Sequence, residues 1–340
     1  MLNYIWGHLK NMEDKNILYI YTGNHRVHRG FANTITKNIV KSSWILPRNY
    51  GIYFNEGEFF KPIILRMFGF IPRKSKIIAL FSDPRLFYFD KGIKFNIKKQ
   101  KLEKYPKIRW FLFKFLLKKL DGAICSGEFQ KSLLKKYFNG PIRVVWPFIS
   151  KEKYIKLKRI KPTLNEKNIL FITTGDDYYC KGFDFLVDIF DSLKKEFPRL
   201  TLFVLGDFKV NEKWRKKGVC FEGFRNVEDY FKKSSLTVHF GRGEGFGVNI
   251  LESLLAGVPT MVSKYTGAKE VVEKINPHLV IPLNKDIVIN KIKEYFYLNK
   301  KDRYILSRKG KKIASLFSEE RILKQFPEEF RKLIKAIHNT

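Results

Sequence analysis

Two glutamates frame a glycine-rich segment that could hold a phosphorylated ligand. Glu244 lies within a run of alternating glycines, and Glu252 follows eight residues later. Glycine has no Cβ, so this backbone can adopt positive φ and approach a ligand closely. An apolar run ends near Phe240 and a helical pattern covers 248–256, so the segment reads as strand, glycine loop and helix start. The free amides and positive dipole end of such a helix suit a diphosphate.

The spacing of the two glutamates argues against a hydrolytic pair. Eight residues of continuous helix rise about 12 Å, which exceeds the separation of glycosidase carboxylates. Two hydrogen-bonding roles along one extended ligand fit better, with Glu244 near a sugar and Glu252 near a ribose diol. A glycine loop with two surface glutamates and no ligand is the alternative, because glycine motifs also occur without function.

Short apolar runs alternate with helical patterns along the chain. Continuous apolar strands interleaved with helices are typical of parallel sheets covered on both faces, so we expect an α/β protein. The expected strands are 17–21, 77–81, 123–125, 143–146, 169–173, 201–205, 236–240, 259–262 and 279–281, and the expected helices include 183–196, 226–233 and 248–256.

The chain length of 340 residues exceeds what one hydrophobic core usually organises, so two domains are expected. The segment 150–162 is charged, weakly periodic and ends in proline, which predicts a linker there. We expect one domain over 1–155 and a second over 165–317. A helix N-cap pattern at Ser318 predicts a C-terminal helix over 318–340 that packs back toward the first domain.

The formal net charge is +33. Such a field attracts anionic partners, including nucleotides, phospholipid head groups and nucleic acid. A lysine-rich composition with solvated charge everywhere accounts for the value equally well. We find no apolar run long enough to span a bilayer and no secretory signal. The three cysteines lie far apart, without metal or disulfide spacing, so we expect a cytoplasmic protein.

Two stretches in the first half, 61–76 and 107–119, are both aromatic and basic. A basic helix with Trp and Phe can lie in a membrane interface while its lysine stems snorkel. That would suit a lipid-linked acceptor and a peripheral position on the inner face of an anionic membrane. The favoured interpretation of 107–119 is instead a Phe-rich helix buried in the first domain.

Beyond these inferences, the segment 244–252 resembles the Glu-x7-Glu signature of retaining glycosyltransferase family 4, which has the GT-B fold. The resemblance covers about residues 165–275 well and the first domain loosely. It implies two Rossmann-like domains whose parallel sheets face each other across a cleft, with the acceptor side in the first domain and the donor side in the second. Other segments of this chain resemble further elements of the family in the same order, namely 121–131, 174–186, 202–207, 221–229 and 267–272.

The resemblance implies transfer of a hexose from a nucleotide-diphosphate sugar to a glycan or lipid-linked acceptor, with retention and without a metal or other cofactor. Lys181 would offset the charge of the leaving diphosphate, Glu244 would bind the donor sugar and Glu252 the ribose. The implied donor-binding residues are Gly30, Gly175, Lys181, Gly206, Phe224, Arg242, Glu244, Gly245, Phe246, Gly247, Val248, Asn249 and Glu252.

Polar residues after two expected strands of the first domain are further candidates. His25, His28 and Arg29 follow the strand 17–21 and are acceptor-side candidates. Gly30 is expected to open a helix whose amide faces the donor phosphates. Asp83 follows the strand 77–81 and joins Glu244 and Lys181 as a third catalytic candidate, in contact with acceptor or donor sugar.

One position departs from the family pattern. The family carries an arginine after its glycine, and this chain has Asp176 there. An acidic residue beside a diphosphate is unfavourable. We therefore expect Asp176 to turn away, or Lys181 to be assisted by Arg242 or Arg29.

Two alternatives to hexose transfer stay open on the sequence alone. One is a transferase that glycosylates DNA, since the charge would hold a duplex, although the sequence has no nucleic-acid-binding motif. The other is a non-enzymatic basic protein that binds nucleic acid or membrane and has a degenerate donor site.

Overall fold

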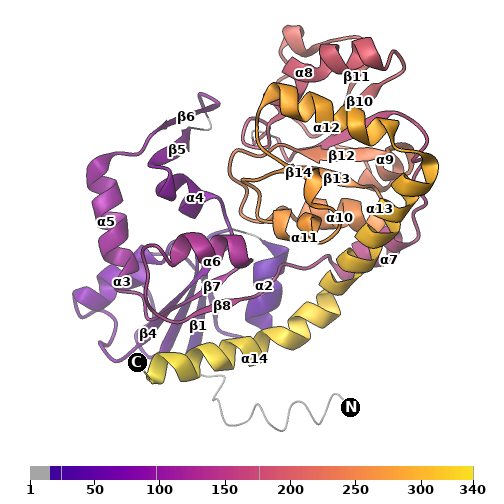
Figure 1. Ribbon diagram of the computed structural model, residues 1–340. Helices are drawn as coiled ribbons and strands as arrows, with labels where there is room; N and C mark the ends of the chain where they lie inside the picture. The colour runs from indigo at the N-terminus through magenta and orange to yellow at the C-terminus, as the bar shows by residue number, and fades with distance from the viewer. Residues whose placement is uncertain (1–15, 24, 97, 176, 340) are drawn as a thin grey trace, which may run out of the picture. The chain divides into compact units, whose positions relative to one another are not determined.

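The computed structural model describes residues 16–339 apart from 24, 97 and 176, and it divides into two compact units. Unit 1 consists of the chain up to Gly92 together with Tyr105–Pro147 and the C-terminal segment from Glu320. Unit 2 consists of Ile93–Lys104 and Phe148–Glu319. Each unit contains a six-stranded sheet in which every strand pair is parallel (Figure 1), as the alternation of apolar runs and helices predicts.

The sheet of unit 1 has two strands that we did not expect, and one of them is central. The central strand β3 ends in Asn55 and Glu56, which are polar yet buried. Their hydrogen bonds make the burial possible, because the Asn55 amide donates to backbone carbonyls and Glu56 accepts from the Tyr19 hydroxyl at 2.9 Å. In spatial order the strands are β2 (Ile39–Lys41), β1 (Ile17–Tyr21), β3 (Ile52–Glu56), β4 (Lys76–Phe81), β7 (Gly122–Cys125) and β8 (Ile142–Val144).

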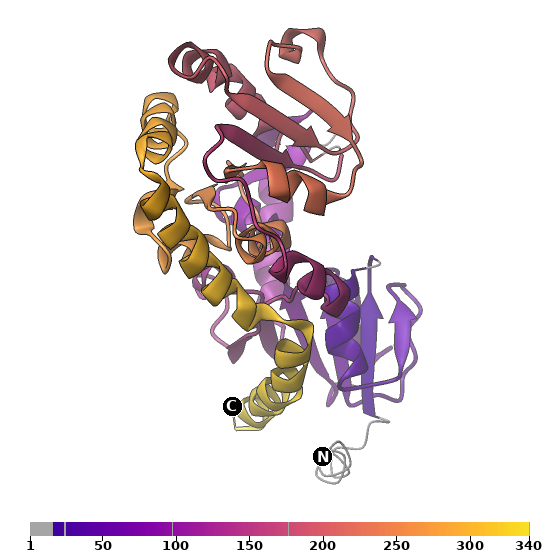
Figure 2. The same ribbon diagram turned by 90° about the vertical axis from the view of Figure 1, so that its right-hand side faces the viewer.

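The C-terminal helix α14 (Glu319–His338) packs in unit 1. Its Phe326 ring stacks on Phe31 at a centroid distance of 4.6 Å, and Phe330 meets Phe54 at 5.4 Å. In Figure 1 and again in Figure 2, α14 runs in yellow beside the indigo-to-purple strands of this unit. The other helices of unit 1 are α2 (Arg26–Asn33), α3 (Phe60–Met67), α4 (Arg85–Asp90), α5 (Lys107–Leu117) and α6 (Glu128–Leu134).

We expect Phe326→Ala to destabilise unit 1 by about 3–5 kcal/mol, because it empties a fully buried aromatic site. Denaturant unfolding followed by circular dichroism measures the change. Lys324→Ala, on the exposed side of the same helix, is the matched control. A stability loss in the Phe326 variant no larger than in the Lys324 variant would contradict the packing role of α14.

The sheet of unit 2 follows the predicted strands closely. Only β11, at one edge, was not among them. In spatial order the strands are β11 (Val219–Gly223), β10 (Thr201–Leu205), β9 (Asn168–Ile172), β12 (Leu236–His239), β13 (Thr260–Ser263) and β14 (Val280–Ile281). The helices are α7 (Lys151–Lys158), α8 (Phe183–Glu196), α9 (Val227–Lys233), α10 (Val248–Ala256), α11 (Lys269–Glu273), α12 (Lys285–Tyr297) and α13 (Lys300–Ala314).

The expected linker at 150–162 is wrong. This segment forms α7, whose Leu157 is fully buried and whose lysines lie toward solvent. The high charge of the segment obscures the helix in the sequence, because only one residue of the helix is buried. Unit 2 accordingly starts at Phe148. It also includes the antiparallel hairpin of β5 (Ile93–Asn96) and β6 (Lys101–Lys104).

Within the described part of the chain, no helix combines the length and apolarity needed to cross a membrane.

Candidate functional site

The glycine-rich segment follows β12 at the carboxyl edge of the unit 2 sheet. Helix α10 begins at Val248 and ends at Ala256, as predicted. Gly247 and Gly257 bound it with φ of +95° and +87°, in the left-handed region that favours glycine. No described side chain caps the start of α10. The helix therefore presents uncapped first-turn amides and its positive dipole end at the sheet edge, where parallel α/β sheets bind ligands.

The glycine loop is held in shape by the loop that follows β13. The Glu244 amide donates to the Tyr265 carbonyl at 3.1 Å, and the Gly267 amide donates to the Glu244 carbonyl at 3.1 Å. A Cβ on Gly267 would lie only 2.0 Å from the Gly245 oxygen, so the two loops touch through their backbones. The loop is thus preorganised, which favours electrostatic stabilisation of a ligand held against it.

Glu244 faces His239, a residue that the sequence pattern did not indicate. The Nε2 atom of His239 lies 3.4 Å from Oε2 of Glu244, and His239 is almost fully buried. Burial alone would raise the pKa of Glu244, but His239 and Lys181 outweigh it and hold this pKa below its usual value. Glu244 is therefore ionised at neutral pH and acts as a hydrogen-bond acceptor, suited to sugar hydroxyls.

Lys181 lies in the loop between β9 and α8, with its side chain 11% exposed. Its Nζ is 2.8 Å from Oδ2 of Asp177. Asp177 also accepts hydrogen bonds from the hydroxyls of Thr173 and Thr174. Burial alone would raise the pKa of Asp177, but Lys181 and these hydrogen bonds lower it below its usual value. Asp177 is thus an acidic neighbour of Lys181 that the sequence did not single out, while Asp176 lies outside the described residues.

A close backbone contact brings the Lys181 loop to the end of β12. Gly182 has φ of +82°, and a Cβ there would lie 2.2 Å from the Phe240 oxygen. Lys181 is consequently near enough for its charge to lower the pKa of Glu244. The structure therefore brings together two of the three predicted catalytic residues.

Arg242 links the glycine loop to the start of α8 through an ion pair with Asp184. Its guanidinium makes a two-bond ion pair with Asp184, at 2.7 and 2.9 Å, and lies over the Tyr179 ring at 4.3 Å. Its backbone amide donates to the Cys180 carbonyl. This cation already has a partner, so a donor contact from Arg242, or assistance to Lys181, stays a prediction.

Glu252 lies in the second turn of α10 and has different neighbours from Glu244. Its Oε1 accepts a hydrogen bond from Lys153 of α7 at 2.8 Å. Burial raises the pKa of Glu252, and Lys153 only partly opposes the rise. The separate partners agree with separate roles for the two glutamates and give no sign of an acid/base pair.

The remaining predicted donor residues follow neighbouring strands of unit 2. Gly175 and Gly206 have φ of +129° and +134° and let the loops after β9 and β10 pack closely. Phe224 follows β11 and is 69% exposed, available to stack on a flat ring. The residues that the topology gathers at this edge are Gly175, Lys181, Gly206, Phe224, Arg242, Glu244, Gly245, Phe246, Gly247, Val248 and Asn249.

In unit 1, the two histidines predicted for the acceptor side both lie close to Glu56, a residue that the sequence pattern did not indicate. The Nδ1 atom of His28 is 2.7 Å from Oε1 of Glu56, and Nε2 of His25 is 3.8 Å from the same oxygen. Arg29 lies over the Tyr21 ring at 6.0 Å. The expectation for Gly30 is wrong: α2 begins at Arg26, so the Gly30 amide is inside the helix, where it bonds the preceding turn instead of facing a ligand.

The cluster of His25, His28 and Glu56 has the spacing of a metal site, because its ligand atoms lie within 4.8 Å of one another. Glu56, however, is already engaged by the Tyr19 hydroxyl and by His28. The cluster is explained by this hydrogen-bond network. The absence of a metal in the reaction stays a prediction.

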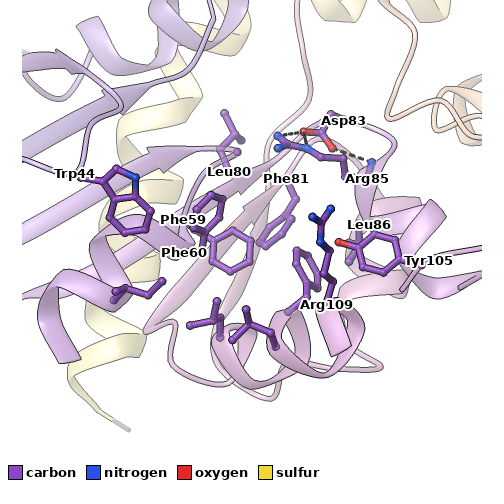
Figure 3. A pocket seen from close by; sticks show the side chains of 15 residues that line it. Trp44, Phe59, Phe60, Leu80, Phe81, Asp83, Arg85, Leu86, Tyr105 and Arg109 are labelled. Atoms are coloured by element: carbon purple, nitrogen blue, oxygen red, sulfur yellow. Dashed lines mark hydrogen bonds and ion pairs between the residues drawn. The ribbon is translucent and has the colours of Figure 1, made fainter. Parts of the chain in front are cut away.

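Asp83 lies at the mouth of an apolar cavity of about 430 Å³ in unit 1 (Figure 3). Its Oδ2 accepts from the Arg85 side chain at 2.8 Å, and its Oδ1 accepts from the Arg85 amide at 2.8 Å. Asp83 therefore shapes the turn into α4. A contact with acceptor or sugar, as predicted from its position after β4, is an additional role that stays a prediction.

Residues 155–313 match the family model described as glycosyl transferases group 1. The chain is 26% identical to an uncharacterized 41.2 kDa protein in the cps region of Klebsiella pneumoniae, over 62% of this chain and 59% of that protein. It is 23% identical to an uncharacterized glycosyltransferase of Haemophilus influenzae, over 54% of this chain and 56% of that protein. The chain thus spans less than two thirds of the length of these curated relatives.

Among solved structures, Anabaena HepE in complex with UDP superimposes with a TM-score of 0.67 and 15% identity, over 93% of this chain and all of that one (100%). The fold is GT-B, as the resemblance implied. The family match lies in unit 2 and includes the glycine loop, Lys181 and both glutamates. The resemblance to GT-B glycosyltransferases is therefore confirmed.

Proposed function

We propose that this chain is a retaining glycosyltransferase that moves a hexose from a nucleotide-diphosphate sugar to a glycan or lipid-linked acceptor, without a metal. The observation that supports it most is the uncapped start of α10, which lies beside the ionised Glu244 and near the buried Lys181. The group 1 match over unit 2 supports it further. HepE, which shares the fold, has been solved with UDP and with UDP and glucose, so a uridine diphosphate sugar is the first donor to examine.

The geometry suggests how each group would act. The diphosphate would lie against the first-turn amides of α10, where the helix dipole favours negative charge. Lys181 would offset the charge that grows on the diphosphate as the bond from the anomeric carbon to the phosphate oxygen breaks. Glu244 would hold the sugar hydroxyls, and Glu252 the ribose. The acceptor hydroxyl oxygen would form its bond to the anomeric carbon as the phosphate leaves, and its proton would pass to the departing phosphate. Positioning and leaving-group stabilisation would supply most of the rate.

A thermal-shift screen tests the donor class. We expect one of the UDP-, GDP-, ADP- and TDP-sugars to raise the unfolding midpoint, since a ligand at a hundred times its dissociation constant adds about 2.7 kcal/mol. The corresponding nucleoside monophosphate is the matched control, because it lacks the second phosphate that α10 and Lys181 would bind. No shift with any of the four sugars would overturn the proposal.

A further inference from the structure

Helix α5 exposes a continuous apolar stripe. Ile108, Phe111, Leu112 and Phe115 follow one another at the spacing of a single helix face and are 77%, 64%, 52% and 46% exposed. The favoured expectation of a buried helix is therefore wrong for these four residues. The buried residues of α5 are Leu116 and Leu117, in its last turn. Water-soluble proteins seldom leave an apolar stripe of this size uncovered, so the stripe points to a partner.

The stripe continues onto the end of α3. Met67, Phe68 and Phe70 are 49%, 74% and 51% exposed. Met67 and Phe115 border the same shallow hollow, and the Arg66 guanidinium donates to the Lys119 carbonyl, which fastens the two helix ends together. We call the surface made by Met67, Phe68, Phe70, Ile108, Phe111, Leu112 and Phe115 the α3–α5 face.

Cations outnumber acidic residues around the α3–α5 face, although Arg66 pairs with Asp121 and Lys61 pairs with Glu58. The segments 59–82 and 104–120 contain lysines and arginines but no aspartate or glutamate. Arg109 lies beside the stripe and lines the apolar cavity, and among the described residues its side chain has no hydrogen-bond or ion-pair partner. Exposed apolar side chains bordered by an excess of cations complement the surface of an anionic bilayer, with hydrocarbon below and phosphate above.

The apolar cavity of unit 1 connects to this face. Leu112 belongs to the stripe and also lines the cavity, together with Phe113 and Leu116 of the same helix. Arg109 and Arg85 lie on one side of the cavity and Trp44 on the opposite side (Figure 3). The cavity of about 430 Å³ has aromatic walls, with Arg109 at one side and Arg85 paired with Asp83 next to it. It has the size and polarity of a pocket for a hydrocarbon chain with an anionic head. This favours a lipid over a protein as the occupant.

We propose that the α3–α5 face is a docking surface for an anionic lipid bilayer. The apolar side chains lie below the head groups, the surrounding lysines and arginines contact the phosphates, and the cavity opens to a hydrocarbon chain from the membrane. All of these features belong to unit 1. The inference therefore stands or falls independently of sugar-nucleotide binding in unit 2.

Co-sedimentation of the full chain with vesicles tests this surface. We expect binding to mixed phosphatidylcholine–phosphatidylglycerol vesicles that survives high salt in part, because insertion of apolar side chains is not screened. The triple variant Phe111→Ser, Leu112→Ser, Phe115→Ser should bind at least about tenfold more weakly. Its unfolding midpoint should not fall, since the three side chains are already exposed.

The control variant removes exposed apolar side chains that lie outside the α3–α5 face. Ile287 and Leu316 of unit 2 are 40% and 45% exposed, so Ile287→Ser with Leu316→Ser should leave vesicle binding unchanged. Equal loss in both variants would overturn the proposal, because it means apolar adsorption without a specific face. No loss in the triple variant, or binding that vanishes entirely in high salt, would overturn it too, because each means adsorption through net charge alone. Absence of binding by the unmodified chain would overturn it as well.

Discussion

Replacing Glu244 by alanine should abolish sugar transfer while the protein stays folded. The carboxylate is ionised, part-exposed and held by a loop whose backbone bonds do not involve its side chain. Its loss removes the acceptor that would orient the sugar hydroxyls, and a positioned group of this kind is worth about 10²–10³-fold in turnover. Glu244→Gln should lose nearly as much, because an amide keeps the size and gives up the charge. Steady-state transfer from the donor found in the thermal-shift screen measures both.

The matched control is Glu212→Ala, which removes a carboxylate from the same unit at an 84% exposed site. It should transfer at the normal rate. Unfolding curves of the Glu244 variants should overlay that of the control within the error of the method. Activity in Glu244→Ala equal to that of the control would remove this residue from the reaction, and unfolding of the variant would mean that its loss of activity says nothing about chemistry. In that second case Glu244→Gln decides the matter.

Five of the six strands in the unit 2 sheet could be predicted from the sequence because each is a short run with apolar residues at most positions, whereas the edge strand β11 could not. The strand 201–205 and the helices 183–196 and 248–256 have the predicted bounds. Central strand β3 could not be predicted, since its polar end is buried only by virtue of tertiary hydrogen bonds to Tyr19 and to neighbouring backbone. Local sequence does not show where such partners come from.

Only part of the candidate site could be proposed from the sequence, for the same reason. Lys181 and Glu244 could be found because they belong to motifs with fixed spacing, whereas His239 and Asp177 gain their importance from contacts made in the folded chain. A histidine that ends a buried strand directly before a glycine loop was the available signal for His239. Periodicity revealed an amphipathic helix at 107–119 but could not decide whether its apolar side faced the core, because a stripe has the same spacing on either side.

Replacing Lys181 by alanine should lower the turnover of transfer by about 10²–10³-fold, with a smaller effect on donor affinity. The reason is that the cation would gain most when negative charge develops on the leaving diphosphate, while the α10 amides would already bind the diphosphate in the ground state. The variant also leaves Asp177 without its lysine, close to where a diphosphate would lie. Single-turnover kinetics alongside donor titration separate the two effects.

The unpaired Asp177 carboxylate in the Lys181→Ala variant allows a sharper test than that single variant. If the unpaired carboxylate repels the diphosphate, then Asp177→Asn added to Lys181→Ala should restore donor affinity and leave turnover low, because the repulsion is gone but no cation has returned. Lys216→Ala is the matched control, since it breaks a similar pair with Asp191 at 2.6 Å elsewhere in unit 2 and should change neither quantity. Turnover restored by the double variant would assign the whole effect to Asp177, and a Lys181 variant indistinguishable from the Lys216 control would leave the reaction without this cation. Either result would move leaving-group stabilisation onto the helix amides alone, which are backbone groups that no side-chain substitution removes.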